Sequence, residues 1–208
     1  MLQVLVVFLV SYLIGSIPTA YIAVRIKARI DIRLAGSGNV GTMNAYEVTG
    51  SRLLGIAVLV VDVAKGAVAA LLGEWLGHGS VMVFGTSLFG VVCGHCFPVW
   101  LKFKGGRGLA TTAGGMLVGA WPIVVVWLAL WGMGYLIMKN IHAGNAFAIV
   151  ATPLLAWSLP HKFLALLLPG AFSSSELLVA YTIVSVVLLF RHTKPLMELI
   201  HSSSNAER

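Results

Sequence analysis

Long apolar segments alternate with short polar stretches along almost the whole chain. A transmembrane helix needs about 20 consecutive apolar residues, and several of these segments approach or exceed that length. Gly15 and Pro18 interrupt the first segment, since both weaken or break a helix. The pattern predicts an all-α membrane protein. The apolar segments cover residues 2–24, 53–72, 81–101, 109–138, 146–159 and 177–190.

The segment from Leu109 to Met138 is too long for one straight span and too short for two full ones. Cations lie directly before it and at Lys139, and both groups favour the same side of the membrane, which requires an even number of crossings. Trp121 and Pro122 offer a turn. We therefore expect about seven transmembrane segments, including a short helix over residues 109–120 that pairs with a longer one over residues 123–138.

Hydrophobic residues make up 59% of the 208 residues and charged residues only 10%, which excludes an ordinary soluble domain. The formal net charge of +7 comes from cations that gather between the apolar segments, as in cytoplasmic loops near anionic lipid headgroups. We therefore expect no nucleic-acid partner. The chain is predicted to form one multi-pass domain over residues 1–208, with the N-terminus outside, the C-terminus cytoplasmic and a disordered tail at residues 202–208.

Cations interleaved with glycines follow the third apolar segment. Lys104 and Arg107 supply positive charge, and the glycines allow backbone N–H groups to approach an anion. The stretch then enters a new helix, whose N-terminus also favours phosphate. We predict a phosphate-binding loop, and the alternative is that the cations only mark the cytoplasmic side. The predicted binding residues are Lys104, Gly105, Gly106, Arg107, Gly108 and Thr111.

A second polar stretch, between the first two apolar segments, is rich in glycine and in hydroxyl and amide side chains that can bind a polyol or a phosphate. Its glycines also match the fingerprint of a dinucleotide site, but that fingerprint requires a βαβ unit, and here a membrane span lies on either side. We predict a substrate-binding loop, with a flexible interhelical loop as the alternative. Its residues are Gly36, Ser37, Gly38, Asn39, Gly41 and Asn44.

Ionisable groups and thiols also occur inside the apolar segments. Asp62 and Lys65 share one helix face, either as a structural ion pair or as part of a substrate pocket. Cys93 and Cys96 have the spacing of a redox dithiol or of half a zinc site, but a membrane thiol oxidoreductase that relays electrons generally needs a second pair. His95 either contacts substrate or packs at a helix end. The sequence contains no metal-ligand set and no nucleotide motif, so we expect no cofactor.

Four motifs, in this order, resemble those of the bacterial acyl-phosphate:glycerol-3-phosphate acyltransferase family. They are the glycine-rich motif around Ser37, the Asp-x-x-Lys-Gly at residues 62–66, the glycine–cation block at residues 94–108 and the Arg-His at residues 191–192. The resemblance implies a seven-helix enzyme of the bacterial inner membrane with its active site at the cytoplasmic face. Such enzymes transfer a fatty acyl group from acyl phosphate to the 1-hydroxyl of glycerol 3-phosphate, which gives lysophosphatidic acid and phosphate in phospholipid synthesis.

The same resemblance implies that Ser37, Arg107 and His192 are catalytic residues and that the glycines around them cradle phosphate. Acyl phosphate is a mixed anhydride with a good leaving group, so positioning and charge stabilisation can carry most of the rate. His192 either binds phosphate as a cation or assists proton transfer. The expected partners are acyl phosphate, glycerol 3-phosphate and membrane lipid, and we expect a monomer.

Two positions depart from the family pattern. Glu47 stands where the family usually carries an arginine, and Pro195 stands three residues after His192, where an asparagine is usual. Both family residues are associated with holding the polar substrate, and a carboxylate repels phosphate unless it pairs with a cation such as Arg52. Two alternatives follow. One is a related acyltransferase with another acceptor, and the other is a membrane carrier for organic phosphates, which needs polar positions that continue to the outer face.

Overall fold

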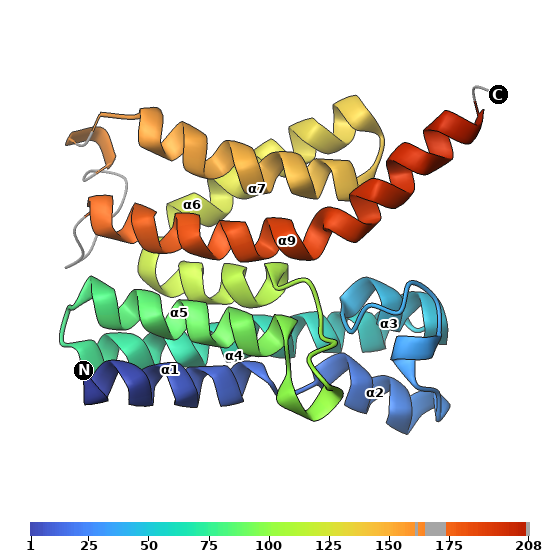
Figure 1. Cartoon of the computed structure of the whole chain (residues 1–208), viewed down its shortest axis with the longest axis horizontal. Helices are drawn as coiled ribbons and strands as arrows, with labels where there is room; N and C mark the ends of the chain where they lie inside the picture. The colour runs from blue at the N-terminus through green and yellow to red at the C-terminus, as the bar shows by residue number, and fades with distance from the viewer. Residues whose placement is uncertain (161, 165–173, 207–208) are drawn as a thin grey trace.

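The computed structural model describes residues 1–160, 162–164 and 174–206, and all regular secondary structure in these residues is helical. The predicted all-α class is therefore confirmed. The longer helices run roughly along the long axis of the bundle (Figure 1). They are α1 (Leu2–Gly15), α4 (Arg52–Gly77), α5 (Val81–Cys96), α6 (Leu109–Met138), α7 (Ile141–Ser158) and α9 (Ser174–Ala206); the shorter elements are α2 (Thr19–Ala28), α3 (Thr42–Thr49) and the 3₁₀ turns η1 (Ile32–Leu34) and η2 (Val99–Leu101).

Five stretches of the described residues are long and apolar enough to cross a membrane. Many of their exposed side chains are large and apolar, such as Leu5, Val60 and Leu128, and a surface of this kind suits lipid contact. The chain is therefore a multi-pass integral membrane protein. The five stretches are Leu2–Ala28, Arg52–Gly77, Val81–Leu101, Leu109–Met138 and Ser175–Leu199.

The first apolar segment contains a break, as its glycine and proline predict. α1 ends at Gly15, and Pro18 directly precedes α2 as its N-cap residue. Proline favours a helix start because its missing N–H would have no intrahelical partner there. The carbonyl of Ile17, in the break, accepts a hydrogen bond of 3.2 Å from the Nζ of Lys65 in α4. The interruption thus supplies a polar partner for a buried ammonium group.

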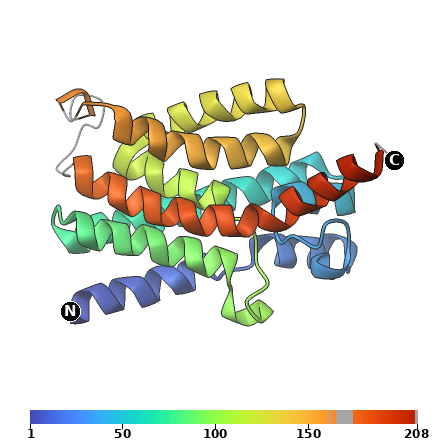
Figure 2. The ribbon, with the colours of Figure 1, turned by 45° about the horizontal axis from the view of Figure 1, so that its top comes forward.

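α6 reverses its direction partway along. Ala120 has φ −163° and ψ 65°, outside the helical region, and Pro122 follows it. The two halves of the element run along the bundle in opposite directions (Figures 1 and 2). The turn lies where the sequence predicts a boundary between a helix over residues 109–120 and one over residues 123–138.

α9 extends beyond the ends of the other helices (Figure 1). It runs to Ala206 and includes Pro195. Residues 202–206 therefore continue a helix where the sequence predicts a disordered tail, since adding a residue to an existing helix costs much less than starting one. Residues 207–208 lie outside the described part of the chain.

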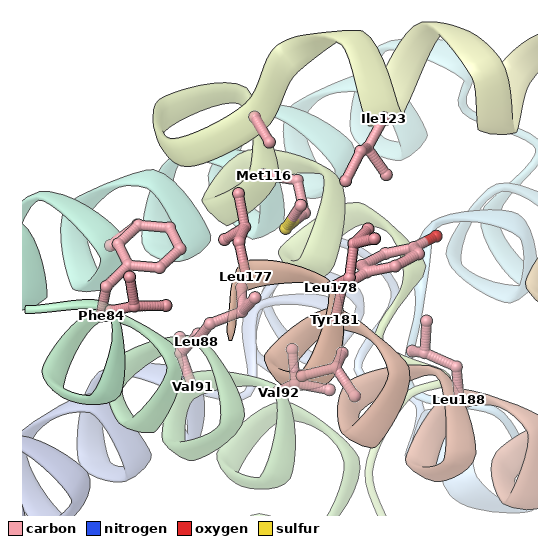
Figure 3. Packing of buried hydrophobic residues seen from close by; sticks show 14 of the residues in the cluster. Phe84, Leu88, Val91, Val92, Met116, Ile123, Leu177, Leu178, Tyr181 and Leu188 are labelled. Atoms are coloured by element: carbon pink, nitrogen blue, oxygen red, sulfur yellow. The ribbon is translucent and has the colours of Figure 1, made fainter. Parts of the chain in front are cut away.

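The main hydrophobic core lies between α5, α6 and α9 (Figure 3). Phe84 and Leu88 of α5 meet Met116 of α6 and Leu177 of α9, all of them fully or almost fully buried. A second, smaller cluster packs α2, η1, α3 and η2 against α4. The first core holds the long helices together, and the second supports the loops at the end of the bundle away from the N-terminus.

Glycines allow α4 and α6 to approach each other closely. A Cβ atom at Gly66 would lie 2.9 Å from the carbonyl carbon of Thr111 and 3.0 Å from the nitrogen of Gly115, and a Cβ atom at Gly114 would collide with the carbonyl of Val63. Such contacts are shorter than packed side chains permit. Small residues at a membrane helix interface stabilise it through this close approach.

Gly66→Ala is therefore expected to destabilise the protein by about 1–3 kcal/mol, because α4 and α6 must move apart. Thermal unfolding in detergent micelles measures the effect. Gly132→Ala is the matched control, since a Cβ atom at Gly132 meets nothing within 4 Å, and we expect its stability to equal or slightly exceed that of the parent protein. Equal destabilisation by both substitutions would contradict the close-packing explanation.

Candidate active site

Segments far apart in the sequence meet at the end of the bundle opposite the N-terminus. The chain between α2 and α4, the glycine–cation loop at residues 102–108 and the C-terminal part of α9 lie there (Figures 1 and 2). They line a cavity of about 450 Å³ that combines five cationic side chains with one carboxylate. The lining residues are Arg33, Ser37, Gly38, Asn39, Lys104, Gly105, Arg107, Phe190, Arg191, Thr193, Lys194, Pro195 and Glu198.

Asn44 holds the loop that carries Ser37. Its side-chain oxygen accepts a hydrogen bond from the backbone N–H of Ser37 at 3.0 Å, and its amide nitrogen lies within 3.2 Å of the carbonyl oxygens of Ile32, Ala35 and Asn39. The side chain is buried, so its hydrogen-bonding groups serve the loop. We predicted that Asn44 binds substrate, and the structure instead gives it a supporting position behind the cavity.

Two glycines of the same loop adopt backbone conformations with positive φ, +57° at Gly36 and +70° at Gly38. A Cβ atom at Gly36 would also collide with the side-chain oxygen of Asn44. Gly41 precedes the first residue of α3 and does not line the cavity. The glycines therefore shape the loop, while Ser37, Gly38 and Asn39 line the cavity.

The backbone amides of Gly105 and Gly106 are not free to bind phosphate, contrary to the sequence-based prediction. They donate hydrogen bonds to the carbonyls of Cys96 and His95 at 3.2 and 3.1 Å. A Cβ atom at either glycine would collide with the C-terminal end of α5 or with the His95 ring. Glycine is needed here because the loop packs directly against α5, and not because its amides face a ligand.

Arg191 fastens this loop to α9. Its guanidinium donates hydrogen bonds to the carbonyls of Gly105 at 2.8 Å and Gly106 at 3.0 Å, and it lies 5.3 Å from the ring centre of Phe97. The amides and the carbonyls of Gly105 and Gly106 are thus both occupied by the protein. The charged groups of the loop that line the cavity are the side chains of Lys104 and Arg107.

Arg107 is half-buried, and its terminal nitrogen lies 3.1 Å from Nδ1 of His142 in α7. Burial, followed by the nearby charge of Arg191, lowers the pKa of Arg107 from its usual value. Both causes indicate a cation that is incompletely compensated by the protein and is suited to bind an anion. No carboxylate of the described residues forms an ion pair with Arg107.

Arg33 enters the cavity from η1 with its own counter-ion. It forms an ion pair of 2.6 Å with Asp31 and lies 5.2 Å from the ring centre of Tyr21. The hydrogen bonds from Arg33 lower the pKa of Asp31 to about 2. Arg33 therefore has a fixed position and contributes less uncompensated charge than Arg107.

His192 is fully buried in α9 and does not line the cavity. Its Nδ1 lies 2.7 Å from the carbonyl of Leu188, one turn earlier, which requires an N–H at Nδ1 and leaves a lone pair on Nε2. That Nε2 atom has no partner among the described residues. Arg107 and His142 are close enough to act on the ring electrostatically. His192 is thus prepared to accept a hydrogen bond or a proton.

Asp62, Lys65 and His95 form a buried cluster behind the glycine–cation loop. Lys65 pairs with Asp62 at 2.8 Å, and Nδ1 of His95 lies 3.7 Å from the same carboxylate oxygen. A small cavity of about 10 Å³ lies among these residues and Gly105. The cluster does not line the larger cavity, so the structure favours the structural ion pair over the substrate pocket, and it gives His95 a supporting position.

Two other predicted binding residues also lie outside the large cavity. Thr111 is buried, and its carbonyl faces Gly66 of α4. Gly108 has φ +87° and precedes α6, and a Cβ atom there would lie 2.7 Å from Leu188 and 3.0 Å from the sulfur of Cys96. Cys93 and Cys96 are both free thiols.

The chain is similar to glycerol-3-phosphate acyltransferases over nearly its whole length. A family model described as glycerol-3-phosphate acyltransferase matches residues 5–202. The chain belongs to the glycerol-3-phosphate acyltransferase family. It is 35% identical over 200 residues to the Nitrobacter winogradskyi glycerol-3-phosphate acyltransferase, covering 96% of this chain and 93% of that protein. It is 43% identical over 152 residues to glycerol-3-phosphate acyltransferase 2 of Moorella thermoacetica, covering 73% of this chain and 76% of that protein.

Solved structures of this family share the fold. Crystal structures of PlsY, an integral membrane glycerol 3-phosphate acyltransferase, in its glycerol 3-phosphate form and its lysophosphatidic acid form match with TM-scores of 0.79 and 0.77. At 24% identity, each match covers 96% of this chain and 92% of PlsY. The helical arrangement of this acyltransferase is therefore that of PlsY.

The cationic cavity and its surroundings include residues that the sequence did not single out. Arg33 and Lys194 belong to the cations that the sequence assigns to the cytoplasmic side, Arg191 appears there only as part of the Arg-His motif without a role of its own, and His142 is an ordinary polar residue. One local signal was available for His142. Asn140 is a typical residue before a helix start, and its side chain accepts hydrogen bonds from the backbone of His142 at 2.8 Å and Ala143 at 3.2 Å. It places His142 in the first turn of α7.

Proposed function

We propose that this acyltransferase transfers a fatty acyl group from acyl phosphate to the 1-hydroxyl of glycerol 3-phosphate and releases lysophosphatidic acid and inorganic phosphate. Membership of the glycerol-3-phosphate acyltransferase family supports the reaction type and the acceptor. The observation that carries the proposal is that a cationic cavity and an apolar cavity are lined by neighbouring parts of the same segments, the start of α6 with the loop before it, and α9. Phosphate-bearing head groups and a lipid tail can then be held side by side.

The apolar cavity, of about 70 Å³, lies between the two halves of α6 and α9. Leu109, Met116, Trp127, Tyr181 and Leu188 are among its lining residues. Leu109 directly follows the glycine–cation loop, and Leu188 lies one turn before Arg191 and His192. This proximity supports the entry of the acyl chain between the halves of α6 while the phosphate of the donor occupies the cationic cavity.

In the proposed reaction, the 1-hydroxyl oxygen attacks the acyl carbonyl carbon, and the bond from that carbon to the phosphate oxygen breaks. The hydroxyl proton ends on the departing phosphate, so the products are an ester and hydrogen phosphate. Arg107 and Lys104 bind phosphoryl oxygens and stabilise the developing negative charge. Ser37 and Asn39 hydrogen-bond the reacting oxygens. His192 lies behind the cavity wall, so the 1-hydroxyl must enter past Arg107 for Nε2 of His192 to accept its hydrogen bond or relay its proton.

Glu47 and Pro195 replace family residues that are associated with holding the polar substrate. Other cations must then attract the phosphate of the acceptor. Glu47 is exposed on α3, and the ion pairs of the described residues do not join it to Arg52. Pro195 lines the cavity without an amide side chain, but Lys194 and Arg33 line it as well. These two cations support glycerol 3-phosphate as the acceptor. In this proposal they supply the positive charge for the acceptor's phosphate that an arginine at the position of Glu47 usually supplies in the family.

We also propose seven transmembrane segments, with α6 contributing two, an external N-terminus and a cytoplasmic C-terminus. The cationic loops at residues 25–33, 102–107 and 191–194 occupy one end of the bundle, and cytoplasmic loops carry such an excess of lysine and arginine (Figure 1). In this orientation the cavity opens to the cytoplasmic face of the bacterial inner membrane. The proposal includes a monomer, because one chain contributes all the groups assigned above.

The proposed donor and acceptor are tested together with purified protein and radiolabelled glycerol 3-phosphate. Acyl phosphate, acyl-CoA and acyl carrier protein thioester are supplied in parallel. We expect labelled lysophosphatidic acid from acyl phosphate alone. Labelled product from a thioester would refute the donor assignment. If no donor gives labelled product, the acceptor assignment is refuted.

A further inference from the structure

His142 does not line the cationic cavity but contacts Arg107, which does, and the proposed reaction does not yet use it. Its Nδ1 atom lies 3.1 Å from the terminal nitrogen Nη1 of Arg107. A guanidinium group has only donors, so the imidazole must supply a lone pair at Nδ1. His142 is therefore neutral in this arrangement, with its proton on Nε2.

The bond uses one end of the Arg107 guanidinium and leaves the rest for a ligand. No other hydrogen bond or ion pair of that side chain occurs among the described residues. The remaining N–H groups can then meet phosphoryl oxygens in the cavity that Arg107 lines. An arginine fixed at one nitrogen loses less side-chain freedom on binding than a free one.

The backbone around His142 is itself fixed. The Asn140 side chain accepts hydrogen bonds from the N–H groups of His142 and Ala143 at the start of α7. The imidazole therefore extends from a capped helix end toward the loop that carries Arg107. A rigid helix end can hold a flexible arginine side chain at a defined point of the cavity.

The surroundings of His142 favour its neutral form. Burial lowers its pKa below the usual value for histidine, and the positive charge of Arg107 lowers it further. The carboxylates of Glu198 in α9 and Glu47 in α3 oppose that shift. His192 of α9 also interacts electrostatically with this ring. The positive end of the α7 dipole acts in the same direction as Arg107.

We propose that His142 is a positioning residue that holds the Arg107 guanidinium for phosphate, and that protonation of His142 releases it. This inference rests on the proposed function only where it predicts a change in the rate of acyl transfer. The contact between His142 and Arg107 does not depend on that function. Protonation turns Nδ1 into a donor that faces another donor, and it places two positive charges next to each other. The bond is therefore present above the pKa of His142 and is lost as the pH falls through it.

A comparison of His142→Asn with His142→Ala separates the effect of the hydrogen bond from the effect of losing the imidazole ring. The asparagine oxygen can replace Nδ1 as an acceptor but does not titrate, whereas alanine offers no acceptor. At about pH 8, we expect kcat/KM to fall roughly tenfold in His142→Ala and less than about threefold in His142→Asn. As the pH falls from about 8 through the pKa of His142, as measured for that histidine by NMR, the parent enzyme should lose activity relative to His142→Asn. An unchanged ratio of the two activities over this range would overturn the proposal.

A double-mutant cycle tests whether His142 acts through Arg107. In an Arg107→Ala background, we expect His142→Ala to cause no further loss of kcat/KM, since the side chain that it holds is absent. The same tenfold loss in both backgrounds would indicate an independent role and overturn the proposal. His78→Asn is the matched control, because His78 is exposed at the opposite end of the bundle and has a positive φ that asparagine tolerates.

Histidine NMR of labelled protein in micelles gives a readout that does not depend on catalysis. We expect His142 to carry its proton on Nε2 at about pH 8 and its pKa to rise in Arg107→Ala, because a neighbouring positive charge is removed. A proton on Nδ1, or a pKa unaffected by Arg107→Ala, would overturn the contact even if the protein transfers acyl groups. The expected NMR result without acyl transfer would refute the proposed function and leave the contact established.

Discussion

Replacing Arg107 with alanine is expected to lower kcat/KM for acyl transfer by roughly a hundredfold to a thousandfold. The substitution removes a half-buried cation that lines the cavity and that forms no ion pair with a carboxylate of the described residues. Removal of one preorganised donor to a developing negative charge costs about this much in other enzymes. The loss is measured as the initial rate of lysophosphatidic acid formation at varied concentrations of acyl phosphate and glycerol 3-phosphate.

Two further substitutions show whether the effect belongs to this position. Arg107→Lys keeps the charge but loses the fork of N–H donors, so we expect an intermediate rate. Lys27→Ala removes an exposed cation of α2 that does not line the cavity, and we expect nearly full activity. A similar loss in Lys27→Ala would mean that the net charge of the membrane face matters more than the site.

The second large effect is expected for His192→Asn, with kcat reduced by about a hundredfold. The asparagine amide can still donate to the carbonyl of Leu188, so the buried hydrogen bond of 2.7 Å has a replacement. What disappears is the Nε2 lone pair, the atom without a partner among the described residues. Single-turnover kinetics measure the chemical step, while thermal unfolding verifies that the variant remains folded.

His201→Asn provides a closely matched control on the same helix. Nδ1 of His201 lies 2.7 Å from the carbonyl of Met197, four residues earlier, as Nδ1 of His192 does with Leu188. His201 is exposed, however, and does not line the cavity. We expect normal kcat for this variant. Equal kcat in the parent protein and in His192→Asn would remove His192 from the proposed chemistry.

Much of the architecture was predictable because local rules determine it. The turn at Ala120 follows from an apolar segment of unsuitable length with Trp121 and Pro122 inside it. The break before α2 follows from Pro18. The meeting of polar loops at one end follows from the distribution of lysine and arginine, since each crossing reverses the side on which the next loop lies.

The roles of the glycines were less predictable, because they depend on contacts between distant residues. A glycine beside cations suggests free amides, yet Gly105 and Gly106 bond to the end of α5 and to Arg191, which lies 85 or more positions later. The contact between Arg107 and His142 spans 35 positions and two halves of α6. No local pattern specifies which side chains such packing brings together.

The central claim is that the cationic cavity holds the reacting phosphoryl groups while the acyl chain lies between the halves of α6. The most direct measurement is a structure of the protein with glycerol 3-phosphate and a non-hydrolysable acyl phosphonate. The account predicts phosphoryl density within hydrogen-bonding distance of Arg107 and Ser37, with the acyl chain against Leu109 and Leu188. Head groups bound elsewhere, or an acyl chain bound away from α6, would contradict it.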